Sequence, residues 1–428
     1  MDAEKLKIFF MGDILSAAVN KNCLRSGIFF VAYNLLRQFA VRDDVELMLC
    51  VPLVTGPEIQ KYLAENMPEA EIHYVNNDCP GICLKYFDFK KKRIECKKHK
   101  MPVRKIIYSI LAGALKIPLK LYRLSADARM KKAAAGCDVM FSPIFHCPDW
   151  GIKISKYTVL HDTIPLIFPE FFEKSTLLLK VVNYINHNDF YFAVSNSARN
   201  DFLKYCPQID PEKIKVTHLA CDEHFIPADD ASIAIAREKY GIPAGKKYIF
   251  SLCTLEPRKN LIRAIKTFIE FIKKNNINDL VFVLGGGHWN EFIVMLEKEI
   301  ADLGDYQDKI IRTGYIDDED VPRLFSGAEF FVYTSQYEGF GLPPLEAMSC
   351  GCPVITSNNS SLPEVVGDAG IMIDFDSDEQ HIKAYEDYYF NPALRAEYAV
   401  KGLARAKLFS WQKCAGQIIN EMKKAVEK

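Results

Sequence analysis

Two glutamates separated by a glycine turn carry the clearest chemistry in this chain. Glu338 and Glu346 lie eight positions apart within residues 337–348, with Gly-Phe-Gly and two prolines between them. The apolar residues 330–333 before them are typical of a buried strand, and the residues that follow, up to 351, of a short helix with a proline in its first turn. We therefore expect Glu338 in the loop at the carboxyl end of a strand and Glu346 about one turn inside the next helix.

The surroundings of this pair predict the kind of ligand. Backbone amides of the turn face the space in front of the strand, where α/β proteins hold phosphate beside a helix N-terminus. Carboxylates accept hydrogen bonds from hydroxyls in pairs, as polyols present them. A ligand that joins phosphate to polyols fits both features, and a nucleotide sugar is such a ligand. The alternative is a helix with two solvated glutamates.

A pair of cations, Arg258 and Lys259, follows the apolar residues 247–252, which are typical of a strand. An arginine forks onto two phosphate oxygens, and a lysine adds a point charge. The pair therefore predicts a diphosphate clamp, which would neutralise the charge that develops on a leaving nucleoside diphosphate. The alternative is an exposed pair that caps the next helix.

Residues 337–348, 351–357 and 362–370 together resemble the paired-glutamate signature of retaining glycosyltransferases of the "group 1" or family-four class, which have the GT-B fold. The resemblance implies that Glu338 contacts hydroxyls of the donor sugar and that Glu346 contacts the ribose. It also places Arg258 and Lys259 on the diphosphate.

The same resemblance implies further donor-binding positions: Gly27, Tyr315, Ile316, Gly339, Phe340, Gly341 and Leu342. Gly27 belongs to a turn where a side chain would block the diphosphate or the acceptor, although a glycine before a helix is also ordinary capping. Tyr315 and Ile316 belong to the segment whose main chain reads the base. The amides of residues 339–342 stabilise the departing phosphate.

His161 begins residues 161–165, which resemble the His-Asp-x-x-Pro element of the family. A histidine at the end of a strand can hydrogen-bond a sugar hydroxyl or lie at the reacting centre. The alternative is a histidine satisfied by a neighbouring carbonyl. We expect an orienting role for His161 and not that of a general base. Residues 195–197 close the next strand and either line the same cleft or are ordinary polar loop residues.

Strand and helix patterns alternate along the chain, which predicts parallel sheets covered by helices. An acidic, proline-containing stretch interrupts the alternation, and a new α/β series starts at residue 247. We expect two doubly wound, Rossmann-like domains that face each other across a cleft, as in GT-B. Residues 1–235 form the acceptor-binding domain and residues 236–410 the donor-binding domain. The resemblance implies that the helix within residues 411–428 packs back on the first domain.

Composition predicts a soluble globular protein, since 49% of the 428 residues are hydrophobic and 25% are charged. The net charge of −1 gives no reason to expect nucleic acid as a partner. The thirteen cysteines lack zinc-like spacing and are interpreted as buried residues in a reducing compartment. Apolar runs are too short for a signal peptide or a membrane span. We expect a cytoplasmic protein that is at most peripheral on the inner face of the membrane.

Residues 85–131 are strongly basic, with fifteen Lys or Arg and three acidic residues around the apolar residues 106–111. A stretch that is both basic and apolar suits the surface of an anionic bilayer. The alternative is an insertion whose charged face is only solvated.

The predicted reaction moves a sugar from a nucleotide donor to a sugar or lipid-linked saccharide acceptor, with retention at the anomeric carbon. We expect no cofactor and no essential metal, and GDP-, UDP- and dTDP-linked donors are not distinguished. The resemblance is to O-antigen and capsule transferases of mannosyl or rhamnosyl type. Alternatives are another GT-B enzyme, such as an epimerase or a phosphorylase, and a non-catalytic member that binds a nucleotide sugar or acts as a scaffold.

Overall fold

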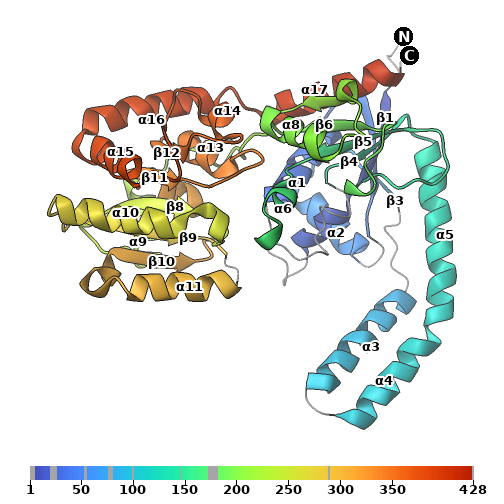
Figure 1. The fold of residues 1–428 in the computed structure, drawn as a ribbon. Helices are drawn as coiled ribbons and strands as arrows, with labels where there is room; N and C mark the ends of the chain where they lie inside the picture. The colour runs from blue at the N-terminus through green and yellow to red at the C-terminus, as the bar shows by residue number, and fades with distance from the viewer. Residues whose placement is uncertain are drawn as a thin grey trace.

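The computed structural model of the chain describes residues 5–19, 27–52, 55–75, 81–98, 101–144, 146–171, 182–287 and 290–426. Two parallel sheets, each between layers of helices, form two lobes that lie side by side (Figure 1). Their strands are short; the central strands are mostly buried, and the strands at the edges are partly exposed. Helices cover both faces of such sheets, so the strands consist of nearly continuous apolar residues.

The N-terminal lobe contains a seven-stranded sheet in the order β3-β2-β1-β4-β5-β6-β7. Its strands are β1 (Leu6–Met11), β2 (Val45–Cys50), β3 (His73–Val75), β4 (Val139–Ser142), β5 (Ser155–Leu160), β6 (Phe190–Ala193) and β7 (Ile214–Val216). The helices around it are η1 (Asp13–Ala18), α1 (Gly27–Ala40), α2 (Gly56–Asn66), α6 (Ile164–Ile167), η2 (Pro169–Phe171), α8 (Asn196–Tyr205) and η3 (Pro211–Lys213).

The C-terminal lobe contains a six-stranded sheet in the order β10-β9-β8-β11-β12-β13. Its strands are β8 (Lys247–Leu252), β9 (Leu280–Gly285), β10 (Ile310–Gly314), β11 (Phe330–Tyr333), β12 (Val354–Ser357) and β13 (Ile371–Ile373). Its longer helices are α9 (Asp230–Lys239), α10 (Leu261–Lys274), α11 (Asn290–Ala301), α15 (Asp378–Phe390) and α16 (Pro392–Ala406). Its shorter helices are η4 (Pro257–Lys259), η5 (Gly304–Lys309), α12 (Val321–Ser326), α13 (Leu342–Ser349) and α14 (Leu362–Val366).

In both sheets, the direction in which successive strands are added reverses next to the strand that comes first in the sequence. β1 lies between β2 and β4, and β8 lies between β9 and β11. In open α/β sheets, ligands bind outside the carboxyl ends of the strands at such a reversal. The residues that follow β8 and β11 are therefore placed where a ligand is expected. These two doubly wound lobes make up a GT-B fold.

The last helix, α17 (Trp411–Val426), lies against the N-terminal lobe (Figure 1). It contacts α1, and Lys423 Nζ donates to Asp44 Oδ2 at 2.8 Å. The expected domain boundary between residues 235 and 236 falls inside α9, which contacts α12 of the C-terminal lobe. We therefore propose a boundary just before α9, because a helix is not divided between two cores.

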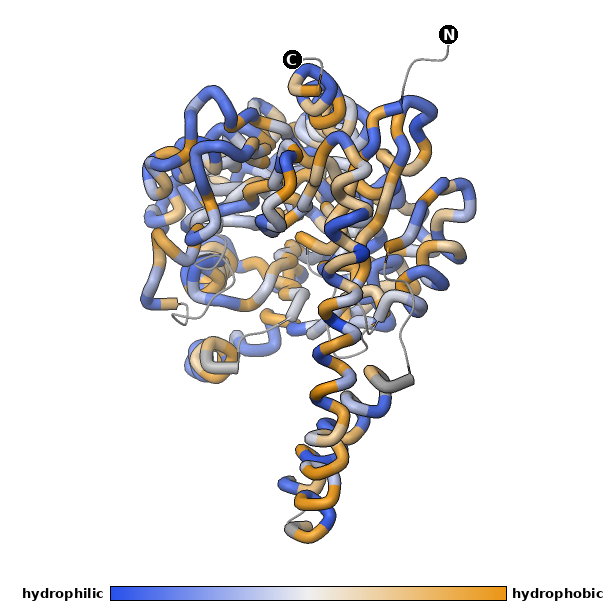
Figure 2. Tube along the Cα trace, turned by 90° about the vertical axis from the view of Figure 1, so that its right-hand side faces the viewer, coloured by the Kyte–Doolittle hydropathy of each residue, from blue (hydrophilic) through white to orange (hydrophobic). Residues whose placement is uncertain are grey.

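A helical arm, described at residues 81–98 and 101–135, projects from the N-terminal lobe (Figures 1 and 2). It consists of α3 (Gly81–Lys98), α4 (Pro102–Ala114) and α5 (Lys116–Ala135). A small cluster of apolar side chains joins α3, α4 and α5: Cys83, Tyr86, Ala112 and Leu119. Within the described part of the chain, no helix has the length and apolar character to cross a membrane.

Candidate active site

The loops that follow β8 and β11 bring the charged residues of the site together. Arg258 and Lys259 lie in the 3-10 turn η4, after β8. Asn260 follows in the left-handed conformation, with φ 59°, and begins α10, because asparagine tolerates this conformation better than most residues. Glu338 lies in the loop between β11 and α13. These are adjacent strands, so their carboxyl ends meet at one edge of the sheet.

Two cations and two carboxylates form a buried ionic cluster at this edge. Arg258 Nη1 lies 2.8 Å, and Lys259 Nζ 2.6 Å, from the same oxygen of Glu338, Oε1. Arg258 Nη2 also donates to Glu256, and Lys259 Nζ donates to the hydroxyl of Tyr333 at 2.7 Å. None of the four charged residues is more than 9% exposed. Its two positive and two negative charges make the cluster close to electrically neutral.

The neighbouring charges in the cluster keep Glu338 and Arg258 ionised. Burial alone would raise the pKa of Glu338, but Arg258 and Lys259 outweigh burial and lower the pKa to about 2. The carboxylates in turn raise the pKa of Arg258, against the effect of burial. Glu338 is therefore a carboxylate at any ordinary pH.

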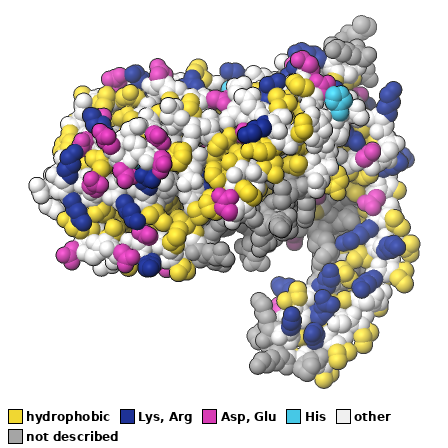
Figure 3. Space-filling model, in the orientation of Figure 1, with side chains coloured by type: hydrophobic (Ala, Val, Ile, Leu, Met, Phe, Trp, Pro, Cys, Tyr) yellow, Lys and Arg dark blue, Asp and Glu magenta, His cyan; other side chains and the backbone are white. Residues whose placement is uncertain are grey.

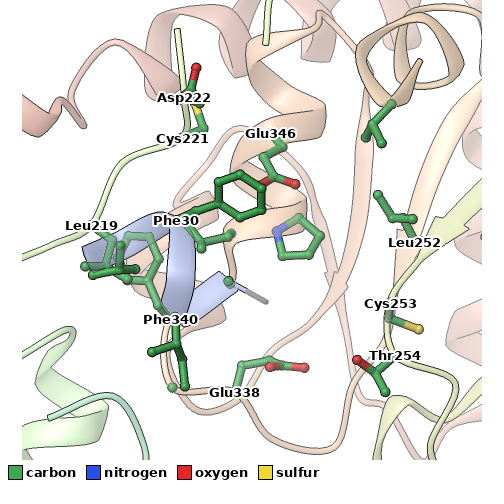
Figure 4. Close-up of a pocket in the computed structure, with 18 of the residues that line it drawn as sticks. Phe30, Leu219, Cys221, Asp222, Leu252, Cys253, Thr254, Glu338, Phe340 and Glu346 are labelled. Carbon is green, nitrogen blue, oxygen red and sulfur yellow. The ribbon is translucent and has the colours of Figure 1, made fainter. Parts of the chain in front are cut away.

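Glu346 faces the same cavity from α13 but has the opposite electrostatic character (Figure 4). Burial raises its pKa to about 7; His224 opposes this rise, and the carboxylates of Asp318 and Asp222 add to it. Asp222 Oδ1 lies 2.9 Å from His224 Nδ1, so these two neighbours form a pair. One carboxylate of the site is thus ionised throughout, and the other titrates near neutral pH.

Glycines let the backbone approach closely at two points of the site. Gly341 begins α13 with φ 114°, which favours glycine. Gly339 lies against the N-terminal lobe, and a Cβ at this position would overlap the carbonyl oxygen of His161. The lack of a side chain at Gly339 therefore lets the turn lie against the backbone of the N-terminal lobe.

His161 follows β5 and lines the cavity. Its Nε2 lies 2.7 Å from the carbonyl oxygen of Pro143, so the ring donates from this nitrogen. Burial lowers the pKa of His161, although the Pro143 carbonyl and Asp162 oppose the shift. A neutral ring that donates from Nε2 leaves Nδ1 as an acceptor. The structure thus shows a histidine that is satisfied by a carbonyl and that also borders the cavity, and its orienting role stays a prediction.

A cavity of about 530 Å³ between the two lobes gathers nearly all of the expected site residues. Those that line it are Gly27, His161, Arg258, Tyr315, Ile316, Glu338, Gly339, Phe340, Gly341, Leu342 and Glu346. Lys259 does not line the cavity and lies behind Glu338, which it contacts. Figure 4 shows Glu338 and Glu346 at two sides of the cavity, with Cys253 and Thr254 across from them.

Sequence reasoning missed several residues that line this cavity or lie next to it. Glu256 forms an ion pair with Arg258. In the sequence, the signal for this pair was a carboxylate two residues before the predicted diphosphate clamp. Asp222 and His224 lie in the irregular stretch between the lobes, where no pattern marked them. Trp411, at the start of α17, also lines the cavity. Gly285 ends β9, and Gly286 follows with φ 122°; a Cβ on Gly286 would overlap the carbonyl oxygen of Cys253.

Comparison with known proteins identifies the family. Residues 232–403 match the family model described as "Glycosyl transferases group 1". The chain is 33% identical over 290 residues to O-antigen chain mannosyltransferase B of Escherichia coli, an alignment that covers 65% of this chain and 74% of that protein. The chain belongs to the group 1 glycosyltransferases.

Other relatives of the glycosyltransferase agree in family and in fold. It is 29% identical over 269 residues to the serotype-specific mannosyltransferase WbdA of Escherichia coli, covering 60% of this chain but only 32% of WbdA. Anabaena Alr3699/HepE, solved in complex with UDP and glucose, has a TM-score of 0.68 at 16% identity, covering 98% of this chain and all of that chain. WaaG, a glycosyltransferase involved in lipopolysaccharide biosynthesis, has a TM-score of 0.60 at 14% identity, covering 97% and 99%.

Within the residues that the structure describes, no group of three or more His, Cys, Asp or Glu side chains is arranged to hold a metal ion. Arg258 lines the cavity, and Lys259 lies next to it in contact with Glu338.

Proposed function

We propose that this glycosyltransferase moves a sugar from a nucleoside-diphosphate sugar to a hydroxyl of a saccharide acceptor, with retention at the anomeric carbon, in the assembly of a surface polysaccharide. The observation that carries the proposal is the cluster of Arg258, Lys259 and Glu338, which shares one cavity with Glu346. The names of the O-antigen relatives support the polysaccharide role.

Each group of the donor has a proposed partner. Arg258 and Lys259 bind the diphosphate, which an arginine fork and a lysine suit. Glu338 accepts hydrogen bonds from hydroxyls of the transferred sugar, and Glu346 accepts them from the ribose. Tyr315 and Ile316 lie where the base is held, and Gly27 leaves room for the diphosphate or the acceptor. No further cofactor takes part in this scheme.

We propose front-face displacement as the chemical step. The bond from the anomeric carbon to the phosphate oxygen breaks, the bond to the acceptor oxygen forms on the same face, and the departing phosphate oxygen takes the acceptor proton. Arg258, Lys259 and the amides of residues 339–342 neutralise the leaving group, so the protein supplies the charge that a metal would otherwise supply. Glu338 is held by both cations and does not act as a nucleophile. His161 orients a sugar hydroxyl through Nδ1.

Binding of a free nucleoside diphosphate is expected to tighten as the pH rises through about 7. Glu346 has a pKa of about 7 and accepts from ribose hydroxyls best when it is ionised. Below this pKa the ionised fraction falls about tenfold per pH unit, and binding must release the proton. Calorimetry in buffers of different ionisation enthalpy measures the proton release. In the variant Glu346→Gln, the proton release that comes from the protein should disappear, and only the release from the nucleotide itself should remain. A proton release equal to that of the wild type would contradict the assignment of the titration to Glu346.

The two glutamates are expected to differ in their effect on the free nucleoside diphosphate. Glu346→Gln should weaken its binding, because the ribose contact is present in product and donor alike. Glu338→Gln should strengthen it while lowering turnover of the intact donor, because Glu338 competes with the diphosphate for Arg258 and Lys259. Calorimetry and turnover of the two variants test this pair of roles. Equal losses of diphosphate affinity would contradict them.

We further propose that the helical arm binds an anionic membrane surface. Large apolar side chains are exposed along α4 and α5 at intervals that keep them on one face: Val103, Ile106, Ile107, Ile110, Ile117, Leu121 and Leu124. Each is at least 49% exposed. Lys and Arg side chains surround this apolar stripe on the arm (Figure 3). Two such arms would repel each other, whereas an anionic bilayer is complementary to both the charge and the stripe.

A donor panel tests the proposed reaction. Thermal unfolding with GDP, UDP, dTDP and ADP selects the nucleotide, because a ligand that binds only the folded state raises its apparent stability. The matching sugar donors are then supplied with a saccharide acceptor, and the anomeric configuration of the product is read by NMR. Nucleotide binding without transfer to any acceptor would favour a non-catalytic role. An inverted product would overturn the retaining mechanism.

A further inference from the structure

A carboxylate of the C-terminal lobe lies at the N-terminus of a helix in the other lobe. Glu364, in α14, accepts from the backbone N–H groups of Asn196 and Ser197 at 2.8 Å each, and from Asn196 Nδ2 at 2.9 Å. His218 Nε2 lies 3.3 Å from the same carboxylate. Asn196 and Ser197 begin α8 in the N-terminal lobe, so every one of these contacts crosses between the lobes.

This contact is ionic as well as directional. Burial alone would raise the pKa of Glu364, but the hydrogen bonds from His218 and from the amides of Asn196 and Ser197 lower it to about 2. The first turn of α8 carries the positive end of the helix dipole, which favours a negative charge there. Hydrogen bonds to a charged acceptor are the stronger kind, and a carboxylate that meets two backbone donors at once is held in one orientation.

The C-terminal lobe holds Glu364 firmly on its own side. Arg405, in α16, donates to the carbonyl oxygens of Glu364 at 2.6 Å and of Val365 at 2.9 Å. The guanidinium thus fixes the short helix α14 to the longer α16. The backbone of Glu364 is therefore held to the rest of the C-terminal lobe.

Ser195, just before α8, and Asp201, within α8, contact the residues on either side of Glu338. Ser195 Oγ accepts from the backbone N–H of Ala198 at 2.9 Å and donates to the carbonyl of Gly339 at 2.7 Å. The hydroxyl of Tyr337 donates to Asp201 Oδ2, also in α8, at 2.6 Å. The backbone around Glu338 is thus positioned by contacts with the opposite lobe.

We propose that Glu364 is a positioning residue that latches the C-terminal lobe onto the N-terminus of α8. With the latch closed, the Ser195 and Tyr337 contacts set the loop that carries Glu338 against His161. With it open, the donor site on the C-terminal lobe remains intact but lies apart from the groups of the other lobe. The latch therefore governs turnover and leaves nucleotide affinity almost unchanged, since only the closed fraction of molecules is competent.

The first test compares Glu364→Ala and Glu364→Gln with Glu270→Gln, a control at an exposed glutamate on α10 of the same lobe. Small-angle scattering of the ligand-free protein should give a larger radius of gyration for both Glu364 variants and no change for the control. kcat/KM should fall about tenfold, as expected for lost charge-assisted hydrogen bonds. The affinity for a nucleoside diphosphate, measured by calorimetry, should stay within twofold.

The second test removes the donors from the other side of the latch. Asn196 is the first residue of α8, a position that accepts proline, and Ser195 before it is extended, with φ −154° and ψ 165°, as a residue before proline prefers. Asn196→Pro deletes the backbone and side-chain donors and keeps the helix, whereas Asn196→Ala deletes only the side-chain donor. The proline variant should resemble Glu364→Ala in its radius of gyration and its kcat/KM. Combining the two substitutions should lower kcat/KM little further.

Scattering needs no donor, so it tests the latch independently of the proposed transfer reaction. Folded Glu364→Ala protein with the radius of gyration and kcat/KM of the wild type would overturn the proposal. So would an Asn196→Pro variant that behaves like Asn196→Ala, or a loss of nucleotide affinity as large as the loss of turnover, because each would mean that Glu364 serves only local stability.

Discussion

Replacement of Arg258 by alanine is expected to lower kcat about a hundredfold, since loss of one contact to a developing charge costs about 3 kcal/mol in the transition state. Charge on the diphosphate grows as its bond to the sugar breaks, so the effect falls on turnover more than on donor binding. Lys259→Ala should act in the same direction. Steady-state kinetics at saturating donor measure the change.

A control must separate this effect from a loss of stability. Arg258 also neutralises Glu256 and Glu338, so its removal leaves a buried carboxylate short of a partner. The double variant Arg258→Met, Glu256→Gln removes one cation and one carboxylate together and keeps most of the side-chain volume. Arg312→Met, on the edge strand β10, is a matched surface control. A folded double variant with kcat within a few-fold of the wild type would exclude Arg258 from the mechanism.

Neutralisation of six cations on the arm is expected to abolish binding to anionic vesicles. The substitutions to glutamine are at exposed positions on α3 and α4: Lys90, Lys91, Arg93, Lys97, Arg104 and Lys105. Each cation near an anionic surface contributes about 1 kcal/mol, so the six account for about 6 kcal/mol, more than a thousandfold in affinity. Vesicle sedimentation at low salt measures the binding, which should weaken for the wild type as salt rises.

The matched control replaces six exposed lysines of the C-terminal lobe: Lys247, Lys266, Lys273, Lys274, Lys298 and Lys383. That variant should sediment like the wild type. Ile110→Ser with Ile117→Ser should weaken binding without abolishing it, because the charges remain. Both arm variants should keep their turnover with a soluble acceptor. Wild-type protein that stays in the supernatant with anionic vesicles at low salt would show that the arm is only a solvated insertion.

Features that depend on neighbouring residues were predictable from the sequence. Strand, turn and helix around Glu338 and Glu346 follow from an apolar run, two glycines and two prolines within residues 330–351, and the structure forms them there. The placement of Arg258 and Lys259 after β8 follows from similar local patterns. The two-domain GT-B fold was confirmed, because alternating strand and helix patterns allow few other arrangements.

Features that depend on distant residues were not predictable. The pairing of Arg258 with Glu338 joins positions eighty residues apart, and only the sheet order brings them together. Burial gives Glu346 its raised pKa, and no local pattern reports burial of a glutamate. The contact of Glu364 with α8 depends on how the two lobes are placed relative to each other, which no local pattern predicts. The assigned roles of the site residues stay predictions until the variants are measured.

The neutral cluster of Glu256, Arg258, Lys259 and Glu338 bears on which nucleotides the cavity admits. Because its cations are already paired, the cavity offers little net attraction to anions in general. A bare nucleotide must part Glu338 from both cations and leaves that carboxylate uncompensated. On the proposed roles, a complete donor brings hydroxyls that donate to Glu338 as its phosphates reach the cations. These roles predict that nucleotides that carry phosphates but no sugar bind more weakly than the complete donor.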